Sequence, residues 1–251
     1  DWVGADSESR CHQAQPWGRQ GRSPEAEAAY REAIQTEPDR LKAYLGLGLV
    51  LRRQRRSAEA EAVFKHAILL KPDGVSAHME LGGALFEQAR YPEAASAYRE
   101  AIRLRPDFAQ AHVSLGLALA RTGAYGDAES AFRQALSLNP KDATAIANLT
   151  TVLRRQRKVA DAEVVQREAL ERDVEPAAVR RDLGDTLYEQ GRYPEAAAAY
   201  REALELAPND AKTRRGVGLA PPRRARQTAG AAGRPAARPP CPGQPPVTAG
   251  P

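Results

Sequence analysis

The sequence predicts an all-α fold, a solenoid of stacked helix-turn-helix units. Three observations predict it. A motif recurs at a fixed interval, apolar residues within each interval follow helical spacing, and alanine or glycine recurs where two helices would cross. The interval is visible in Arg-Tyr-Pro-Glu-Ala, which begins at Arg90 and again at Arg192, 102 residues later or three times 34.

A period of 34 residues divides the middle of the chain into full units, which are 41–74, 75–108, 109–142, 143–176 and 177–210. We number the positions of each unit from 1 to 34. Position 7 is leucine in every unit, and positions 20 and 27 are alanine. Position 8 is glycine, position 24 aromatic and position 32 proline in all units but 143–176. A degenerate unit, 7–40, precedes them.

Each unit is expected to form two helices. Positions 4, 7, 8 and 11 lie on one face of a first helix, and positions 20, 24, 27 and 28 on one face of a second. Small residues at positions 8 and 20 let the two backbones approach closely, and the aromatic ring at position 24 fills the remaining space. Because each pair leaves one apolar face uncovered, the units must stack on one another.

Glycine and proline predict where the helices begin and end. Gly123 and Gly191 occupy position 15, just after the first helix, where a left-handed residue ends a helix. Pro92 and Pro194 occupy position 18, in the first turn of the second helix, where a missing N–H costs nothing. Proline at position 32 ends the second helix.

The pattern of Leu-Gly at positions 7 and 8, alanine at 20, an aromatic residue at 24, alanine at 27 and proline at 32 resembles the tetratricopeptide repeat family. The resemblance covers residues 41–210 fully and extends over the degenerate unit, where Ala26, Tyr30, Ala33 and Pro38 fit. It implies a right-handed superhelical solenoid that binds other proteins.

The repeat pattern sets the domain boundaries. Residues 23–220 form the predicted solenoid, whose first confident helix runs from about Pro24 to Glu37. Residues 1–22 are expected to be poorly ordered. Residues 221–251 are rich in Pro, Arg, Ala and Gly without apolar periodicity, which predicts a disordered tail. A frame error near residue 219 would produce the same composition, and both explanations stay open.

The unit 143–176 departs most from the pattern. It has Thr150 at position 8, Gln166 at position 24 and Val174 at position 32. Loss of the core aromatic ring removes buried apolar area, so we expect this unit to be the least stable.

Composition and motifs argue against catalysis. The sequence has no phosphate-binding glycine loop, nucleophile elbow, zinc motif or paired-cysteine motif, so we expect no enzyme activity, cofactor or metal. Cys11 and Cys241 are interpreted as incidental thiols. His78 and His112, both at position 4, are interpreted as packing residues. No apolar run is long enough to span a membrane. We expect a cytoplasmic protein.

The net charge of +5 comes from the C-terminal end. Residues 211–251 carry eight of the 37 bases and no acid, which leaves 29 bases against 32 acids before them. Nucleic-acid binding by the tail is therefore a minor alternative. Two arginine-rich runs, 51–56 and 153–158, lie at positions 11–16. Cations are favoured at helix C-termini, and an anchor for acidic partners is the other interpretation.

In the tetratricopeptide repeat family, positions 2, 5, 6, 9, 12 and 13 usually face the ligand across a concave groove. Positions 5 and 9 here do not supply the Lys and Asn set with which some members bind a terminal carboxylate. The resemblance implies a groove lined by Leu45, Leu49, Arg52, Arg53, Met79, Phe86, Val113, Leu117, Arg121, Asn148, Arg154, Arg155 and Tyr188.

The predicted function is a scaffold or adaptor that binds a protein or peptide in this groove. An apolar floor edged by arginines suits a segment with apolar and acidic side chains. No small-molecule substrate or membrane partner is evident. The alternative is the substrate-recruiting arm of a larger enzyme, such as a glycosyltransferase, whose catalytic domain lies outside this sequence.

Overall fold

The structure is a computed structural model that describes residues 23–219, and the predictions for residues 1–22 and 221–251 lie outside it. The described residues form twelve α-helices joined by short turns. They are α2 (Ser23–Thr36), α3 (Leu41–Arg53), α4 (Ser57–Leu70), α5 (Val75–Glu87), α6 (Tyr91–Leu104), α7 (Ala109–Arg121), α8 (Tyr125–Leu138), α9 (Ala143–Arg155), α10 (Val159–Glu171), α11 (Pro176–Glu189), α12 (Tyr193–Leu206) and α13 (Ala211–Leu219).

The helices follow the 34-residue units. Every full unit is one pair, from α3 and α4 in 41–74 to α11 and α12 in 177–210. Helix α2 is the second helix of the degenerate unit, within a residue of the predicted bounds. Helix α13 begins a further unit at Ala211. The all-α prediction of consecutive helix pairs is therefore confirmed.

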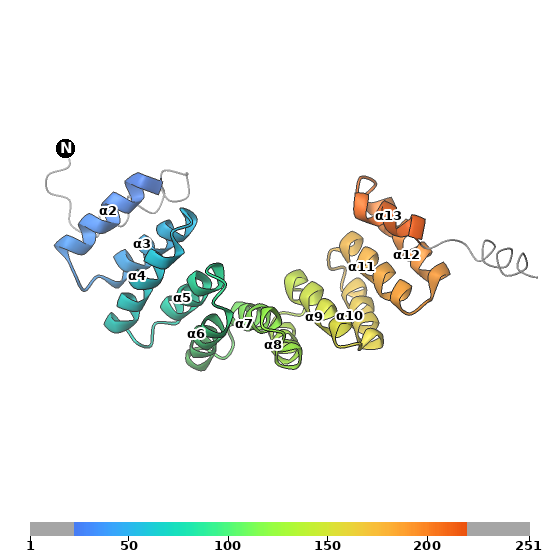
Figure 1. Cartoon of the computed structure of the whole chain (residues 1–251), viewed down its shortest axis with the longest axis horizontal. Helices are drawn as coiled ribbons and strands as arrows, with labels where there is room; N and C mark the ends of the chain where they lie inside the picture. The colour runs from blue at the N-terminus through green and yellow to red at the C-terminus, as the bar shows by residue number, and fades with distance from the viewer. Residues whose placement is uncertain (1–22, 220–251) are drawn as a thin grey trace, which may run out of the picture.

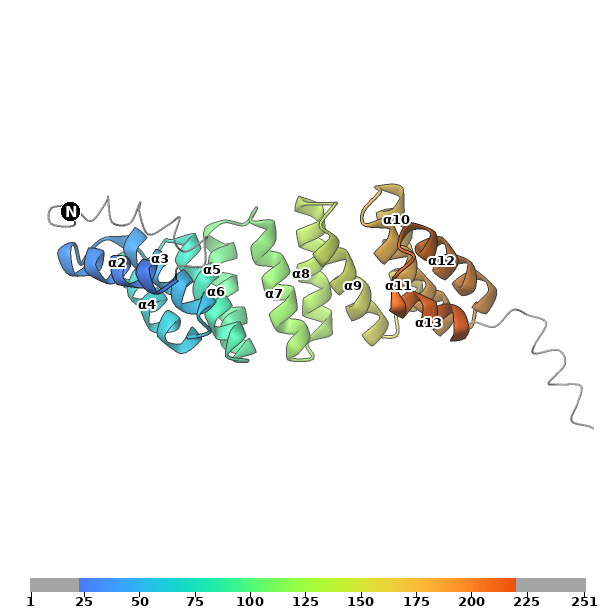
Figure 2. The ribbon, with the colours of Figure 1, turned by 90° about the horizontal axis from the view of Figure 1, so that it is seen from above.

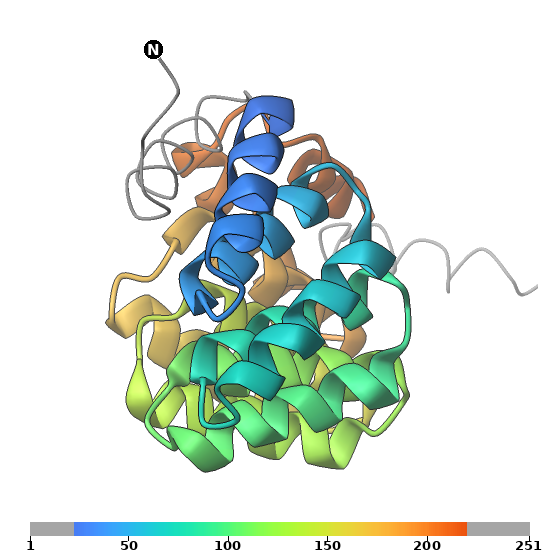
Figure 3. The same cartoon turned by 90° about the vertical axis from the view of Figure 1, so that its left-hand side faces the viewer.

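The pairs stack into an arc whose inner side is made by the first helices (Figure 1). Each first helix contacts the next one, α3 with α5, α5 with α7, α7 with α9, α9 with α11 and α11 with α13. Within residues 23–219, no two successive second helices approach each other to within 8 Å between Cα atoms. Figure 2 looks down onto the concave side, and the end-on view places both ends of the described chain above its middle units (Figure 3).

The two helices of a pair meet through a glycine and an aromatic ring. The position-24 rings of Phe64, Tyr98, Phe132 and Tyr200 are at most 5% exposed. A methyl group on the position-8 glycine of the same unit would lie 2.4 to 2.7 Å from the ring. No real carbon contact is that short, so only glycine allows the observed spacing.

The turn after each first helix has a left-handed residue at position 15. Gly123 and Gly191 have φ of 82° and 76°, as predicted. Arg55, Ala89 and Arg157 adopt the same conformation, with φ of 62°, 59° and 64°. The sequence did not indicate these three, because tertiary packing imposes the turn on side chains that disfavour it.

In unit 143–176, Thr150 and Gln166 replace the glycine and the aromatic ring where the two helices meet. Thr150 and Gln166 are 2% and 1% exposed, and neither amide atom of Gln166 has a hydrogen-bond partner among the described residues. With Val174 in place of proline, α10 ends at Glu171, and Asp173 takes a φ of 57°. A buried amide without partners costs about 1–3 kcal/mol, which supports the expectation that this unit is the least stable.

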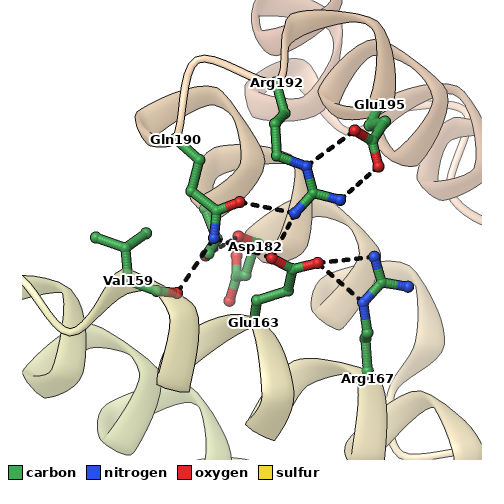
Figure 4. Close-up of polar contacts among 8 residues, drawn as sticks. Val159, Glu163, Arg167, Asp182, Gln190, Arg192 and Glu195 are labelled. Atoms are coloured by element: carbon green, nitrogen blue, oxygen red, sulfur yellow. Dashed lines mark hydrogen bonds and ion pairs between the residues drawn. The ribbon is translucent and has the colours of Figure 1, made fainter.

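Buried or half-buried glutamates at position 21 join consecutive units. Each of these junction glutamates accepts hydrogen bonds from glutamine at position 14 and from arginine or lysine at position 16 of the next unit. For example, Glu163 binds Gln190 at 2.9 Å and Arg192 at 2.6 Å (Figure 4). The junction glutamates are Glu27, Glu61, Glu129 and Glu163.

One junction of full units lacks this contact. Between units 75–108 and 109–142 the three positions hold Ala95, Thr122 and Ala124. The largest apolar cluster of the described chain crosses this junction without interruption, from Leu85 to Ala162. Apolar packing therefore joins the units where the polar contact is absent.

The junction glutamates are held ionised. Burial disfavours the charge of Glu61, but hydrogen bonds from Lys65, Gln88 and Arg90 outweigh it and lower the pKa of Glu61 to about 2. Burial likewise opposes ionisation of Glu163, and hydrogen bonds from its partners lower its pKa to about 2. A carboxyl with a lowered pKa stabilises the fold above its unfolded pKa and loses that contribution as the pH falls.

Acidification should therefore destabilise the solenoid through Glu61 and Glu163. Their contribution is full above pH 4.5 and is lost as the pH falls from 4.5 to about 2. We expect the melting temperature of the Glu61→Gln/Glu163→Gln variant to fall less than that of the wild type between neutral pH and about pH 3. The double variant Glu171→Gln/Glu205→Gln, which changes two exposed glutamates, is the control. Its melting temperature should fall as much as that of the wild type. Equal acid sensitivity of all three proteins would contradict the assignment.

The irregular pair in unit 143–176 should respond to restoration of the pattern. Thr150→Gly alone opens a cavity, and Gln166→Phe alone collides with Thr150, so each is expected to destabilise. Together they recreate the contact of the other units and remove the unpaired amide, and should stabilise by about 1–3 kcal/mol. Urea unfolding of the four proteins measures the coupling. Strictly additive effects would refute a direct contact.

Candidate functional site

Three successive first helices, which form the inner side of the arc, carry partly exposed apolar side chains. Leu45 and Leu49 come from α3, Met79 and Phe86 from α5, and Leu117 from α7. Leu49 is 37% exposed, and the other four are half-buried and pack against the core clusters. We call these five residues the apolar row.

Val113 was expected in the same row, but the structure places it elsewhere. Its side chain is 1% exposed and lies inside the largest apolar cluster. Val113 therefore contributes to the core rather than to a surface that a ligand could reach.

Two predicted groove arginines bind carboxylates of the next unit. Arg52 donates to Glu87 from Nε at 3.1 Å and from Nη2 at 2.7 Å, and its Nη1 contacts Glu80. Arg154 binds Glu189 through Nε at 3.1 Å and through Nη2. These arginines hold neighbouring units together, so their charge is already neutralised within the chain.

Room for Arg52 is provided by a glycine. A methyl group on Gly83 would lie 2.7 Å from the guanidinium carbon of Arg52. Burial by itself lowers the pKa of Arg52, but the hydrogen bond to Glu87 and the charges of Glu80 and Glu87 outweigh it and raise that pKa. The side chain is thus a fixed cation within an ion-pair cluster.

Aromatic contacts hold other predicted groove residues. The guanidinium of Arg121 lies 5.6 Å from the ring centre of Phe86 and 5.9 Å from that of Tyr91, and the two rings meet edge to face. Tyr188 makes the same edge-to-face contact with Tyr193, with centres 5.0 Å apart. These pairs fix the rim of the concave side at equivalent places.

The remaining predicted residues lie apart from the apolar row. Asn148 donates to the Thr144 carbonyl of its own helix at 2.7 Å. Arg53 and Arg155 are exposed at the ends of α3 and α9. Arg155 lines a cleft of about 560 Å³ with Arg154, and its other lining residues are Thr151, Arg157 and Glu189. Arg157 belongs to the arginine-rich run 153–158, whereas nothing in the sequence indicated Thr151.

The histidines make structural contacts. His78 Nε2 lies 2.8 Å from the Pro72 carbonyl oxygen, and His112 Nε2 lies 2.8 Å from that of Pro106. In these two units, position 4 is thereby tied to position 32 of the preceding unit. Within residues 23–219, no group of three or more His, Cys, Asp or Glu side chains is arranged to hold a metal ion. None of the described helices combines the length and apolarity that a bilayer span needs.

Solved structures share this architecture. PilW, described as a type IV pilus biogenesis factor, has a TM-score of 0.70 at 19% identity, covering 83% of this chain and 96% of its own. Pseudomonas aeruginosa PilF has a TM-score of 0.67 at 18% identity, covering 83% and 95%. YrrB, described as having an unusual peptide-binding site, has a TM-score of 0.62 at 19% identity, covering 74% and 96%. At these identities the likeness concerns the fold.

Family models agree with the repeat pattern. A comparison with curated proteins finds no significant match. The model described as tetratricopeptide repeat matches residues 18–74. The model described as Cilia and flagella-associated protein 70 C-terminal domain matches residues 47–232, well over half of the chain. The chain therefore belongs to the family of the Cilia and flagella-associated protein 70 C-terminal domain, which is a family of tetratricopeptide repeats.

Proposed function

We propose that this protein is an interaction scaffold that binds a peptide segment of another protein along the apolar row. Tetratricopeptide repeat domains are generally protein-interaction modules, and such domains are typically non-catalytic. The single observation that carries the proposal is the apolar row itself. Leu49 and the four half-buried residues of the row lie on three consecutive first helices, whose backbones form the inner side of the arc.

The chemistry of the row indicates the kind of segment. A peptide with apolar side chains at helical or alternate spacing would bury the exposed part of Leu49 and of its neighbours, and removing that area from water favours binding. The ion pairs of Arg52 and the stacked Arg121 stand beside the row and keep its rim polar. An apolar floor with a polar rim is the usual anatomy of a specific protein interface.

The place of action is also part of the proposal. The sequence predicts a cytoplasmic protein, and the description of the matching family names cilia and flagella. A partner within a ciliary or flagellar assembly is compatible with both.

Selection from a phage-displayed library of random peptides tests the proposal. We expect the full chain to enrich peptides with apolar side chains. Substitution Leu49→Asp should weaken the best peptide about tenfold or more, because it places a charge against a desolvated apolar contact. Fluorescence anisotropy of the labelled peptide measures the affinity.

Leu138→Asp on α8 is the matched control, because Leu138 is 38% exposed against 37% for Leu49 but lies on a second helix. It should leave the affinity unchanged, and circular dichroism should show both variants folded. Failure to enrich any peptide, or equal effects of the two substitutions, would reject the apolar row as the binding surface.

A further inference from the structure

Position 12 of one unit contacts position 13 of the next along the rim of the concave side. Arg52 binds Glu87, Phe86 lies under Arg121, and Arg154 binds Glu189. Each position-13 side chain in these contacts therefore has a charged or aromatic partner from the preceding unit. We call this series the rim contacts.

Arg155 is the exception in this series. It occupies position 13 of unit 143–176, and position 12 of the preceding unit is Ala120. The methyl group of Ala120 offers neither charge nor ring. Among the described residues, Arg155 has no ion pair, hydrogen bond or ring contact, and its side chain is exposed. The rim thus carries an uncompensated cation at this place.

A second such cation lies beside it. Arg157 is exposed at position 15 of the same unit and has a φ of 64°. A left-handed conformation costs a non-glycine residue stability, and two other units have glycine there. Arg55 and Ala89 share this conformation at position 15, so the backbone alone does not distinguish Arg157. What distinguishes Arg157 is that it lies in the same cleft as Arg155.

Arg155 and Arg157 line the same cleft of about 560 Å³, together with Thr151, Arg154 and Glu189. The charge of Arg154 is neutralised by Glu189 across the cleft. The cleft therefore carries two cations without acidic partners, whereas the Thr151 hydroxyl already donates to the Ala147 carbonyl at 2.9 Å. This set of donors suits a carboxylate, which accepts from guanidinium groups in a bidentate manner.

We propose that this cleft binds acidic side chains, Asp or Glu, of the peptide segment that occupies the concave side. The inference rests on the proposed function and adds a charge preference to it. Arg155 and Arg157 make the contact with the peptide, whereas Arg154 keeps the cleft in shape through Glu189. The cleft lies at the ends of α9 and α11, beyond the apolar row on α3, α5 and α7, so an acidic part would follow an apolar part along the peptide.

Two labelled peptides test this inference with the full chain. One is built of repeated Leu-Ser-Glu-Glu units, and the other has Gln in place of Glu. We expect the wild type to bind the Glu peptide more tightly. In the variant Arg155→Ala/Arg157→Gly, affinity for the Glu peptide should fall about tenfold while affinity for the Gln peptide stays unchanged. Glycine suits the conformation of residue 157, so this variant should fold well.

Arg99→Ala/Arg201→Ala is the control, because both arginines are exposed on second helices and the change in net charge is the same. It should retain the preference for Glu. An equal loss in this control would show a general effect of charge and overturn the inference. The inference would also be overturned if the wild type bound the two peptides equally or did not bind the Glu peptide. The Leu49→Asp comparison is independent of these outcomes and decides the proposed function separately.

Discussion

The close contact between a glycine and an aromatic ring sets the geometry of the whole solenoid. In four of the units, the position-8 glycine lies directly against the position-24 ring, closer than any side chain would permit. That contact fixes the distance between the two helices of a pair. Because four of the five full units repeat it, successive pairs present the same faces, and first helices come to lie beside first helices. The concave side and its apolar row follow from that arrangement.

Both polar and apolar contacts join the units. Junction glutamates connect units through their carboxylates, and rim contacts such as that of Arg52 with Glu87 align the first helices. Where Ala95 replaces the glutamate, a continuous apolar cluster crosses the junction instead. A buried carboxylate requires all of its partners, because an unpaired one would be costly. Glutamate, glutamine and arginine accordingly occur together at a junction or are replaced together.

The sequence predicted the parts of the structure that depend on period and residue size. Leucine at position 7, alanine at 20 and the ring at 24 were enough to place each pair of helices. The sequence did not predict the roles of individual arginines. Arg154 and Arg155 are adjacent in the same run, yet Arg154 pairs with Glu189 of the next unit, whereas position 12 of the unit before Arg155 is Ala120. Val113 was misplaced for a similar reason, since its burial depends on packing in a cluster that draws residues from several units. Such contacts between units carry no signal within a single repeat.

Paired glycine-to-alanine substitutions in one unit test the central contact most directly. A methyl group added to Gly116 would lie 2.7 Å from the Phe132 ring. A methyl group added to Gly126 in α8 would meet open space. We expect Gly116→Ala to lower the free energy of unfolding by about 1–3 kcal/mol through overpacking. Gly126→Ala should raise it by up to about 1 kcal/mol, because alanine favours the helix. Urea unfolding measures both. A Gly116→Ala variant as stable as the wild type would contradict the dependence of the solenoid on this contact.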